Sequence, residues 1–275
     1  MKKIVIKSPA KINFGLNIVS KRDDGFHNIE TIFYPIELHD VLTFEKAEKF
    51  SFTCNNKLIK NDENNLVIKA VRMIEQLVKK EIVLSIALEK NIPLGAGLGG
   101  GSSNAAHTLL SINELFELQI KNEIVNDFAL QLGSDVPFFL HPVPSYATSR
   151  GEILSPIEFE IAKPLLLVNP GIHISTNWAY QKITPKMPEF QLSKLRSNID
   201  SDIASLNGKV VNDFENIAFA AHPLLAEIKK IMFDFKAEFV LMSGSGSTMF
   251  GIFPESNSAQ KANQYFSKTY FTYLQ

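Results

Sequence analysis

The stretch of sequence that decides the fold reads Pro93-Leu94-Gly95-Ala96-Gly97-Leu98-Gly99-Gly100-Gly101-Ser102-Ser103, with five glycines between residues 95 and 101. Glycine loses more backbone entropy on folding than any other residue, so this density needs a structural reason. Residues 82–89 before it read as a strand, and the apolar residues after it, from Ala105 to Leu115, lie at helical spacing. Ser102 and Ser103 are the N-cap candidates of that helix. A strand, a glycine loop and a helix N-terminus direct backbone N–H groups at an anion, so the stretch predicts a phosphate-binding loop.

Several kinds of phosphate loop contain glycines at such density. The glycines at 95, 97 and 100 satisfy G-x-G-x-x-G, but a dinucleotide fold needs an acidic residue on a second strand about 20 residues on, where this sequence is still helical. The sequence lacks the His-Arg-Asp and Asp-Phe-Gly signatures of protein kinases, and Ser102 stands where a Walker loop has lysine. A flexible glycine turn is the remaining alternative. Leu98 inside the loop and the apolar helix after it make that alternative the weaker one.

The composition of the chain restricts its class. The 275 residues are 45% hydrophobic and 21% charged, with a net charge of −1, as in globular proteins of one or two domains. This balance creates no positive field, so we expect no nucleic-acid partner and no binding to a membrane. The single Cys54 excludes an internal disulfide framework. Because the N-terminus lacks a secretory signal and no segment has the apolar length of a membrane span, we expect a cytoplasmic protein.

The order of the predicted elements indicates an α+β fold. Strands are predicted at residues 4–6, 14–19, 26–38, 41–44, 50–54, 82–89, 165–168, 238–242, 248–253 and 270–274. Helices are predicted after the cap candidates Asn64 and Asn65, after the glycine loop, at 124–132 with Gly133 as C-cap, from Ser175 or Thr176, and at 224–232. A turn is predicted at Asp24-Gly25. The two unlike halves place a domain boundary near residue 155.

Lys11 and Asp135 are the candidates for chemistry. Asp135 stands between the predicted end of a helix and the run Pro137-Phe138-Phe139, where burial is expected. Taken alone, Asp135 could be a helix-capping acid and Lys11 a surface lysine. A carboxylate beside an ammonium stays ionised and is a weak base, which phosphoryl transfer tolerates because its transition state is loose. The spacing of the two residues does not decide whether they pair.

Four stretches together resemble the kinase superfamily named after galactose, homoserine, mevalonate and phosphomevalonate kinases. The glycine-rich stretch is similar to its phosphate loop, and the stretches at residues 8–13, 133–139 and 242–247 match its other motifs in the same order along the chain. The resemblance implies that Lys11 lies beside a catalytic acid, Asp135. It implies a second, supporting glycine loop, formed by Gly244, Ser245 and Gly246. It also implies that ATP is bound by Pro93, Leu94, Gly95, Ala96, Gly97, Leu98, Gly99, Gly100, Gly101, Ser102 and Ser103.

The same resemblance implies the architecture and the cofactors. We expect a two-domain fold, with a ribosomal-protein-S5-like α/β domain at residues 1–155 and a ferredoxin-like α+β domain at residues 156–275. ATP is the expected phosphoryl donor, and Mg²⁺ is expected to arrive with it, although its protein ligands cannot be identified from the sequence. The six histidines show no ligand spacing, so we expect no zinc site.

One further motif, Asp24-Gly25-Phe26-His27, resembles one branch of the superfamily, whose substrate is a cytidine diphosphate-linked alcohol of non-mevalonate isoprenoid precursor synthesis. The resemblance implies that His27 reads the cytosine edge and that Phe26 lies against the base. It places Tyr180, the last residue of the stretch at 175–180 and four residues after Thr176, as a second stacking aromatic. The residues implied in substrate binding are Asn13, Phe26, His27, Thr176 and Tyr180. The alternative to base binding is that Phe26 is an exposed aromatic on a hairpin and that Tyr180 is a core tyrosine.

Other functions stay open at this point. Another small-molecule kinase of the superfamily, such as a homoserine or mevalonate kinase, would share the loop motifs. A nucleotide-binding protein without catalysis would share them too, although the retained Lys11 and Asp135 argue against it. Residues 147–152, Ala-Thr-Ser-Arg-Gly-Glu, depart from the family pattern by a serine in place of glycine at 149. Residues 212–215 are assigned to packing only. We also expect a side chain at Gly99 or Gly100 to block the approach of phosphate to the loop.

Overall fold

The computed structural model of the chain describes residues 2–195 and 197–275 and has the predicted α+β organisation. Its residues divide into two compact units. Unit 1 comprises the chain up to Ala10, Ile36–Leu94 and Gly99–Pro142, and unit 2 comprises Lys11–Pro35, Gly95–Leu98 and Val143–Gln275. Both units are therefore discontinuous in sequence. The domain boundary near residue 155 stays a prediction.

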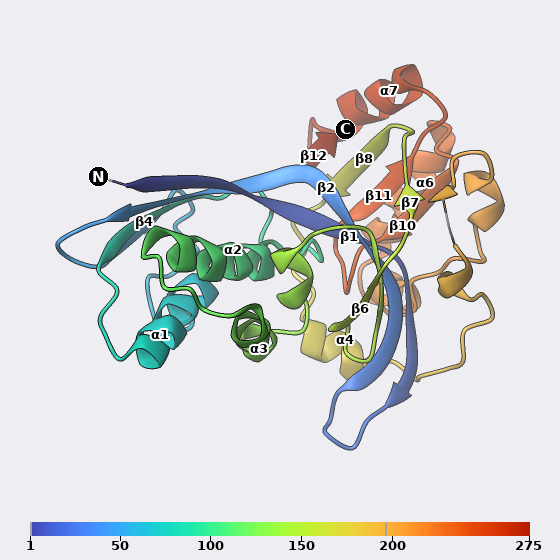
Figure 1. The fold of residues 1–275 in the computed structure, drawn as a ribbon. Coiled ribbons are helices and arrows are strands. Elements are labelled where there is room, and N and C mark those ends of the chain that lie inside the picture. The colour runs from blue at the N-terminus through green and yellow to red at the C-terminus, as the bar shows by residue number, and fades with distance from the viewer. Residues whose placement is uncertain (1, 196) are drawn as a thin grey trace. The chain divides into compact units, whose positions relative to one another are not determined.

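Two long strands contribute residues to both units. β1 (Lys3–Lys21) pairs with β2 (His27–Lys46), and Figure 1 shows them running side by side. Shorter strands at 4–6, 14–19, 26–38 and 41–44 were expected, so the predicted breaks were wrong. Pro9 does not interrupt β1, because β2 is the one named strand that pairs with β1 in the described residues, and an edge strand tolerates a missing backbone N–H. The turn predicted at Asp24-Gly25 is present, with Gly25 at φ 84°.

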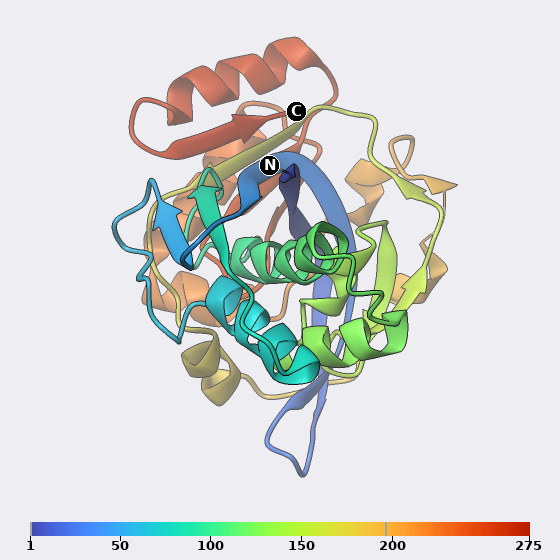
Figure 2. The ribbon, with the colours of Figure 1, turned by 60° about the vertical axis from the view of Figure 1, so that its left-hand side comes forward.

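Unit 1 packs helices against a short sheet. β3 (Ser51–Cys54) pairs in parallel with β4 (Leu84–Glu89), and β4 pairs antiparallel with the end of β2. The helices α1 (Leu66–Val78), α2 (Gly100–Leu115) and α3 (Asn122–Leu132) pack on one another on one side of these strands, as Figures 1 and 2 show. Asn65 caps α1 through its side chain and Gly133 ends α3, as predicted. The 3-10 helix η1 (Pro137–Leu140) follows.

Unit 2 contains a four-stranded antiparallel sheet in the order β10-β11-β8-β12. Its strands are β8 (Leu165–Asn169), β10 (Phe239–Met242), β11 (Met249–Ile252) and β12 (Phe271–Leu274). The helices α4 (Thr176–Lys182), α5 (Glu215–Ala221) and α6 (Pro223–Asp234) connect β8 to β10, and α7 (Ser256–Phe266) precedes β12. This β-α-β-β-α-β connection confirms the predicted ferredoxin-like half. The remaining elements are β5 (Ser145–Thr148), β6 (Ile153–Pro156), β7 (Phe159–Glu160), β9 (Ser197–Asn198), η2 (Leu192–Lys194) and η3 (Ile203–Leu206).

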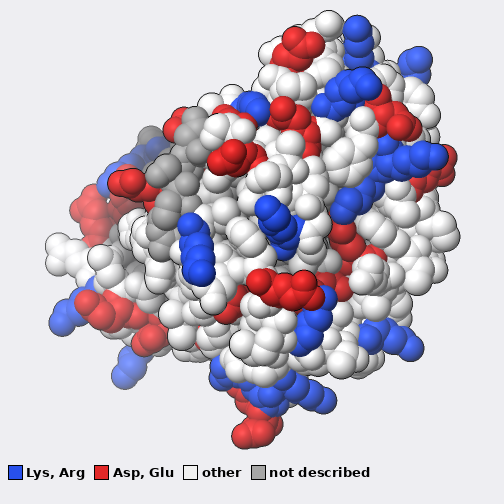
Figure 3. All heavy atoms as spheres, turned by 90° about the vertical axis from the view of Figure 1, so that its right-hand side faces the viewer, with Lys and Arg blue, Asp and Glu red and all other residues white. Residues whose placement is uncertain are grey.

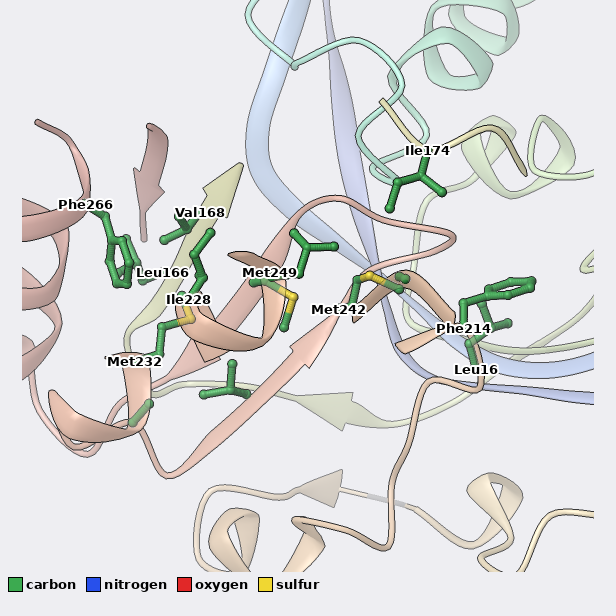
Figure 4. Packing of buried hydrophobic residues seen from close by; sticks show 14 of the residues in the cluster. Leu16, Leu166, Val168, Ile174, Phe214, Ile228, Met232, Met242, Met249 and Phe266 are labelled. Carbon is green, nitrogen blue, oxygen red and sulfur yellow. The ribbon is translucent and has the colours of Figure 1, made fainter. Parts of the chain in front are cut away.

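The core of unit 2 joins this sheet to the inner part of β1. Figure 4 shows Leu166, Val168, Met232 and Phe266 packed around one end, and Leu16, Met242 and Phe214 together at the other. All of these side chains are at most 3% exposed. The apolar run at residues 165–168 and the helical stripe at residues 224–232 predicted Leu166, Val168 and Met232, whereas Phe266 was not predicted. Leu16 and Phe214, which are distant in the sequence, are brought to Met242 by the fold.

The surface carries charges of both signs. Figure 3 shows Lys and Arg interspersed with Asp and Glu over the face that it displays. This mixture accords with the net charge of −1. Among the described residues, no helix has the length and apolar character needed to cross a membrane.

Candidate active site

The glycine-rich stretch forms a loop that leads directly into α2. Gly95, Gly97 and Gly99 have φ values of 59°, 76° and 70°, a region that favours glycine. Gly99 is the N-cap residue of α2, and no side chain within the described residues caps this helix end. Ser102 and Ser103 were predicted as caps, and that prediction was wrong, because the helix already begins at Gly100. The uncapped N-terminus leaves the first backbone N–H groups of α2 for an external acceptor.

Ser103 has a structural position inside unit 1. Its side chain is completely buried and accepts a hydrogen bond from Ser8 Oγ at 2.7 Å. Ser8 Oγ in turn accepts one from Asn104 Nδ2 at 3.0 Å. Ser102 is half-buried in the first turn of α2. Of the two serines, Ser102 is therefore the better placed to meet a ligand.

Gly100 is required for packing. A Cβ built at Gly100 would lie 2.7 Å from Lys90 Nζ and 3.0 Å from the side chain of Ile92. The expectation that a side chain here blocks the approach of phosphate stays a prediction, and the Cβ would in addition press on neighbouring side chains of unit 1. A valine at this position would therefore report on packing as well as on ATP binding.

The second glycine loop contacts the first one through the backbone. A Cβ at Gly97 would lie 2.1 Å from the carbonyl oxygen of Ser243, and one at Gly244 would lie 3.0 Å from the Cα of Gly97. Ser243 Oγ donates a hydrogen bond to Gly97 O at 2.9 Å, and Thr248 N donates one to Ala96 O at 3.3 Å. Both loops therefore need glycine where they meet. The supporting role of Gly244, Ser245 and Gly246 stays a prediction that this contact favours.

Lys11 is buried next to the first loop. Only 3% of its surface is exposed, so it is not a surface lysine. Its ammonium hydrogen-bonds Asn13 Oδ1, lies 3.5 Å from Gly97 O, and stands 4.9 Å from the centre of the Phe33 ring. The backbone N–H of Lys11 donates to Leu98 O at 3.0 Å. The position of Lys11 is thus fixed from several sides, and its positive charge is held against the first glycine loop.

Asn13 connects Lys11 with the rest of unit 2. Its Oδ1 accepts from Lys11, its Nδ2 donates to Thr31 Oγ1 at 3.0 Å, and its backbone N–H donates to Ser243 Oγ at 3.1 Å. The Asn13 side chain is 3% exposed. These contacts favour a role in orienting Lys11. Direct contact between Asn13 and the substrate stays a prediction.

Asp135 lies in unit 1, between the C-terminal end of α3 and η1. Asp135 is half-buried, and the short helix η1 that follows it buries the side chains of Phe138, Phe139 and Leu140. The three apolar side chains anchor the segment that carries the carboxylate. The pairing of Asp135 with Lys11 stays a prediction.

The predicted base-binding residues take two different positions. The imidazole of His27 stacks on the ring of Tyr180, with ring centres 5.0 Å apart and planes at 25°. Phe26 is 48% exposed, and the Arg150 guanidinium lies 4.5 Å from its ring centre. The structure therefore brings His27 and Tyr180 together, while Phe26 packs with Arg150. A clamp of cytosine between Phe26 and Tyr180 stays a prediction.

The surroundings of His27 favour its neutral form. Burial lowers the pKa of His27, and the positive charge of Lys21 lowers it further. A neutral imidazole has one nitrogen that donates and one that accepts. This is the form that can complement a base edge, which presents both donors and acceptors.

Thr176 begins α4, after the N-cap residue Ser175. The Thr176 hydroxyl lies 3.1 Å from that of Ser245. Thr176 is exposed, and Tyr180 follows it one helical turn later. α4 thus connects the second glycine loop with the aromatic pair.

A pocket of about 390 Å³ in unit 1 was not foreseen from the sequence. It lies beside the first turn of α2 and the start of α1, and its volume falls within the range of small-molecule sites. Lys90 lines it and forms a buried ion pair with Asp40, whose other oxygen accepts the backbone N–H groups of Asn91 and Ile92 at 2.8 Å. The signal overlooked in the sequence is Lys90, which stands three residues before the start of the glycine-rich stretch at Pro93. The lining residues are Ile59, Lys60, Asp62, Asn64, Asn65, Leu66, Val67, Leu88, Lys90, Leu94, Gly101 and Asn104.

His107 makes the stability of α2 depend on pH. Burial lowers the pKa of His107 below its ordinary value of 6.5, and its Nδ1 lies 2.8 Å from Ser103 O. The unfolded chain therefore binds the proton more readily than the folded chain, so the free energy of unfolding is fully present above about pH 6.5 and falls as the pH drops below it. In His107→Asn, a side-chain amide replaces the imidazole as hydrogen-bond donor and does not titrate. We therefore expect this variant to lose less stability between pH 7.5 and 5.5 than the wild type. Urea unfolding at both pH values measures this difference; an equal loss in both proteins would contradict it.

Comparison with known proteins gives consistent results over nearly the whole chain. Residues 65–142 match the family described as GHMP kinases N terminal domain, and residues 194–271 match GHMP kinases C terminal. A protein of Chlorobium chlorochromatii named 4-diphosphocytidyl-2-C-methyl-D-erythritol kinase is 38% identical over 97% of this chain and 94% of its own length.

The chain belongs to the GHMP kinase family.

Two further comparisons place it within the GHMP kinases. A Bacteroides fragilis protein with the same name is 39% identical over 92% of this chain and 93% of its own. The crystal structure of a 4-(cytidine 5′-diphospho)-2C-methyl-D-erythritol kinase superposes with a TM-score of 0.83 and 30% identity over 98% of both chains. The GHMP kinase fold predicted from the four motifs is thereby confirmed, and the family is one of ATP-dependent small-molecule kinases.

Proposed function

We propose that the chain transfers the γ-phosphoryl group of ATP to the 2-hydroxyl of 4-diphosphocytidyl-2-C-methyl-D-erythritol, a step of non-mevalonate isoprenoid precursor synthesis. The observation that carries this proposal is the extent of similarity: 38% identity to a kinase of that name over 97% of the chain. The stacked pair of His27 and Tyr180 supports it from the structure, because it offers a planar, partly polar surface to a base.

The reaction forms a bond between the substrate oxygen and the γ-phosphorus and breaks the bond between that phosphorus and the β,γ-bridging oxygen, which leaves with ADP. We assign Asp135 to accept the proton of the substrate hydroxyl. We assign Lys11 to offset the negative charge on the transferred phosphoryl group, since its ammonium is held beside Gly97. Positioning and electrostatic stabilisation account for most of the catalysis in phosphoryl transfer.

ATP binding is assigned to the glycine-rich loop and to the pocket of unit 1. The uncapped α2 N-terminus suits a phosphate chain. The adjacent pocket, which Leu66, Leu88 and Leu94 line with apolar surface, suits a planar base. Mg²⁺ stays a prediction: it is usually held by phosphates and one or two carboxylates, and Asp135 and the Ser102 hydroxyl are oxygen donors of the kind it prefers. The cytoplasmic location also stays a prediction.

We expect Tyr180→Ala to raise the KM for the cytidine substrate by about 5- to 150-fold, on the scale of 1–3 kcal/mol for one stacked base. The KM for ATP should change little, because the glycine loop and the pocket of unit 1 do not use this side chain. His27→Ala should reduce the preference for cytidine over uridine analogues, since an edge contact discriminates where stacking cannot. Steady-state kinetics with both substrates measure these effects. Equal losses for both substrates would point to misfolding.

The direct test of the proposed function is turnover of purified protein with ATP and 4-diphosphocytidyl-2-C-methyl-D-erythritol. Formation of ADP and of the 2-phosphate should be stoichiometric, as followed by phosphorus NMR. Homoserine and mevalonate serve as alternative acceptors. Turnover of one of them, with none of the diphosphocytidyl alcohol, would overturn the substrate assignment and leave the kinase family intact.

A further inference from the structure

Residues 212–215, Asn212-Asp213-Phe214-Glu215, connect η3 to α5, and all four side chains reach other parts of unit 2. The sequence suggested packing only for this segment. Three of its side chains instead make hydrogen bonds to backbone groups of the glycine loop or of β1, and the fourth contacts the proposed base-binding pair.

Asn212 fixes the start of the second glycine loop. It is 3% exposed, and its Nδ2 donates to Met242 O at 2.7 Å and to Gly244 O at 2.8 Å. Its Oδ1 accepts from Phe214 N at 3.0 Å, so donor and acceptor sides are both engaged. The two carbonyls flank Ser243.

Ser243 is the residue that joins the two loops. Its Oγ accepts from Asn13 N at 3.1 Å and donates to Gly97 O at 2.9 Å. Asn212 thus fixes the backbone on both sides of Ser243, the residue whose side chain binds the first glycine loop. Glu215 holds the preceding peptide, because its Oε1 accepts from Met242 N at 2.9 Å.

Phe214 supports the proposed base-binding pair. It is 1% exposed, and its ring stands edge-on to Tyr180 at 5.0 Å and 87°. Tyr180 in turn stacks on His27. Figure 4 shows Phe214 beside Leu16 and near Met242, the residue that precedes the second glycine loop. Asp213 attaches the segment to β1, since its Oδ2 accepts from Ile18 N at 2.7 Å.

We infer that residues 212–215 form a positioning segment that sets two parts of the site separately: Asn212 sets the glycine loop for phosphoryl transfer, and Phe214 sets Tyr180 for recognition of the base. The inference rests on the proposed function for the identity of the base. It predicts that two neighbouring residues have different kinetic effects. A segment that served packing alone would lower stability and both kinetic constants together.

The first experiment compares kcat and KM in two variants. Asn212→Asp keeps the shape and the acceptor for Phe214 N but loses the two donors, so kcat should fall by about 10- to 100-fold, the scale of a reacting group misplaced by about 1 Å. Phe214→Leu removes the ring edge, so the KM for the cytidine substrate should rise by about 2- to 10-fold, with kcat and the KM for ATP nearly unchanged. Asn212→Ala is the second variant should the aspartate prevent folding, which circular dichroism checks.

The chain offers a matched control for each variant. Asn207 Nδ2 also donates to two carbonyl oxygens, those of Ala204 at 3.1 Å and of Glu238, and Asn207 is exposed. Phe266 is 1% exposed and stands edge-on to Tyr265 at 5.2 Å and 87°. Asn207→Asp and Phe266→Leu should cost stability without the kinetic effects. If the two controls reproduced the effects of the two variants, or if both variants lowered kcat and raised KM alike, the inference would be overturned.

A second experiment does not depend on turnover. In the free protein, hydrogen exchange of the backbone amides of residues 243–248 should accelerate in Asn212→Asp and stay unchanged in Phe214→Leu and Asn207→Asp. Calorimetry with CDP should show weaker binding to Phe214→Leu and unchanged binding to Asn212→Asp. If the variants show these differences in exchange and CDP binding but the wild type does not phosphorylate the diphosphocytidyl alcohol, the proposed function is refuted and the positioning segment stays supported. Unchanged exchange in Asn212→Asp would refute the segment.

Discussion

We expect Asp135→Asn to lower kcat by about 10²- to 10⁴-fold, the contribution of a positioned general base. The amide has nearly the shape of the carboxylate but cannot accept the proton of the substrate hydroxyl. The fold and the KM for ATP should change little, because Asp135 is only half-buried and the apolar residues of η1 anchor its segment. Steady-state kinetics with both substrates, together with thermal unfolding, measure these effects.

The control for this experiment is Asp127→Asn, an exposed aspartate on α3 in the same unit. It should retain the turnover of the wild type. Near-full turnover in Asp135→Asn would show that this carboxylate is not the base. Positioning of the two substrates would then account for the catalysis.

Gly97→Ala should have the second large effect, a loss of turnover of about 100-fold or more. The new Cβ would lie 2.1 Å from Ser243 O, so one glycine loop must move away from the other. Displacement of a reacting group by about 1 Å can cost about 10²-fold in rate. Kinetics and ATP binding by calorimetry measure the loss.

Gly208→Ala separates this clash from backbone strain. Gly97 and Gly208 have φ values of 76° and 75°, but no atom of the residues that the structure describes lies within 4 Å of a Cβ at Gly208. Both variants bear the strain of a left-handed residue, about 1–2 kcal/mol in the free energy of unfolding. Only Gly97→Ala should lose activity. If both variants lost stability equally and both kept turnover, the contact between the loops would be dispensable.

The sequence predicts the local elements well where one residue sets a boundary. Asn65 caps α1 and Gly133 ends α3, because side-chain capping and a glycine C-cap are local effects. The start of α2 was predicted three or four residues too late, since a serine cap is the usual signal and this helix has Gly99 as its N-cap. The length of β1 was also missed. Pairing with β2 carries the strand through Pro9, and pairing is not a local property.

For the site, the motifs identify which stretches matter but not what their side chains contact. Lys11 and Asn13 were predicted together, and the structure joins them by a hydrogen bond. The stacking of His27 on Tyr180, which are more than 150 residues apart by their numbers, depends on the fold of unit 2. The pocket beside Lys90 and the two carbonyls held by Asn212 leave no periodic pattern in the sequence. Both were therefore missed.

The discontinuity of the two units limits how the gene can be divided. Unit 2 extends from Lys11 to Gln275 and unit 1 ends at Pro142, so every single cut after Lys11 splits unit 2 and every earlier cut splits unit 1. A fragment that starts at residue 143 would lack Leu16, whose backbone N–H donates to Val211 O at 2.8 Å, and would lack Gly97 as well. Complementary fragments would have to be co-expressed and reassociate to regain these partners. A split-protein reporter built on this enzyme would accordingly read out reassembly of β1 with the C-terminal half.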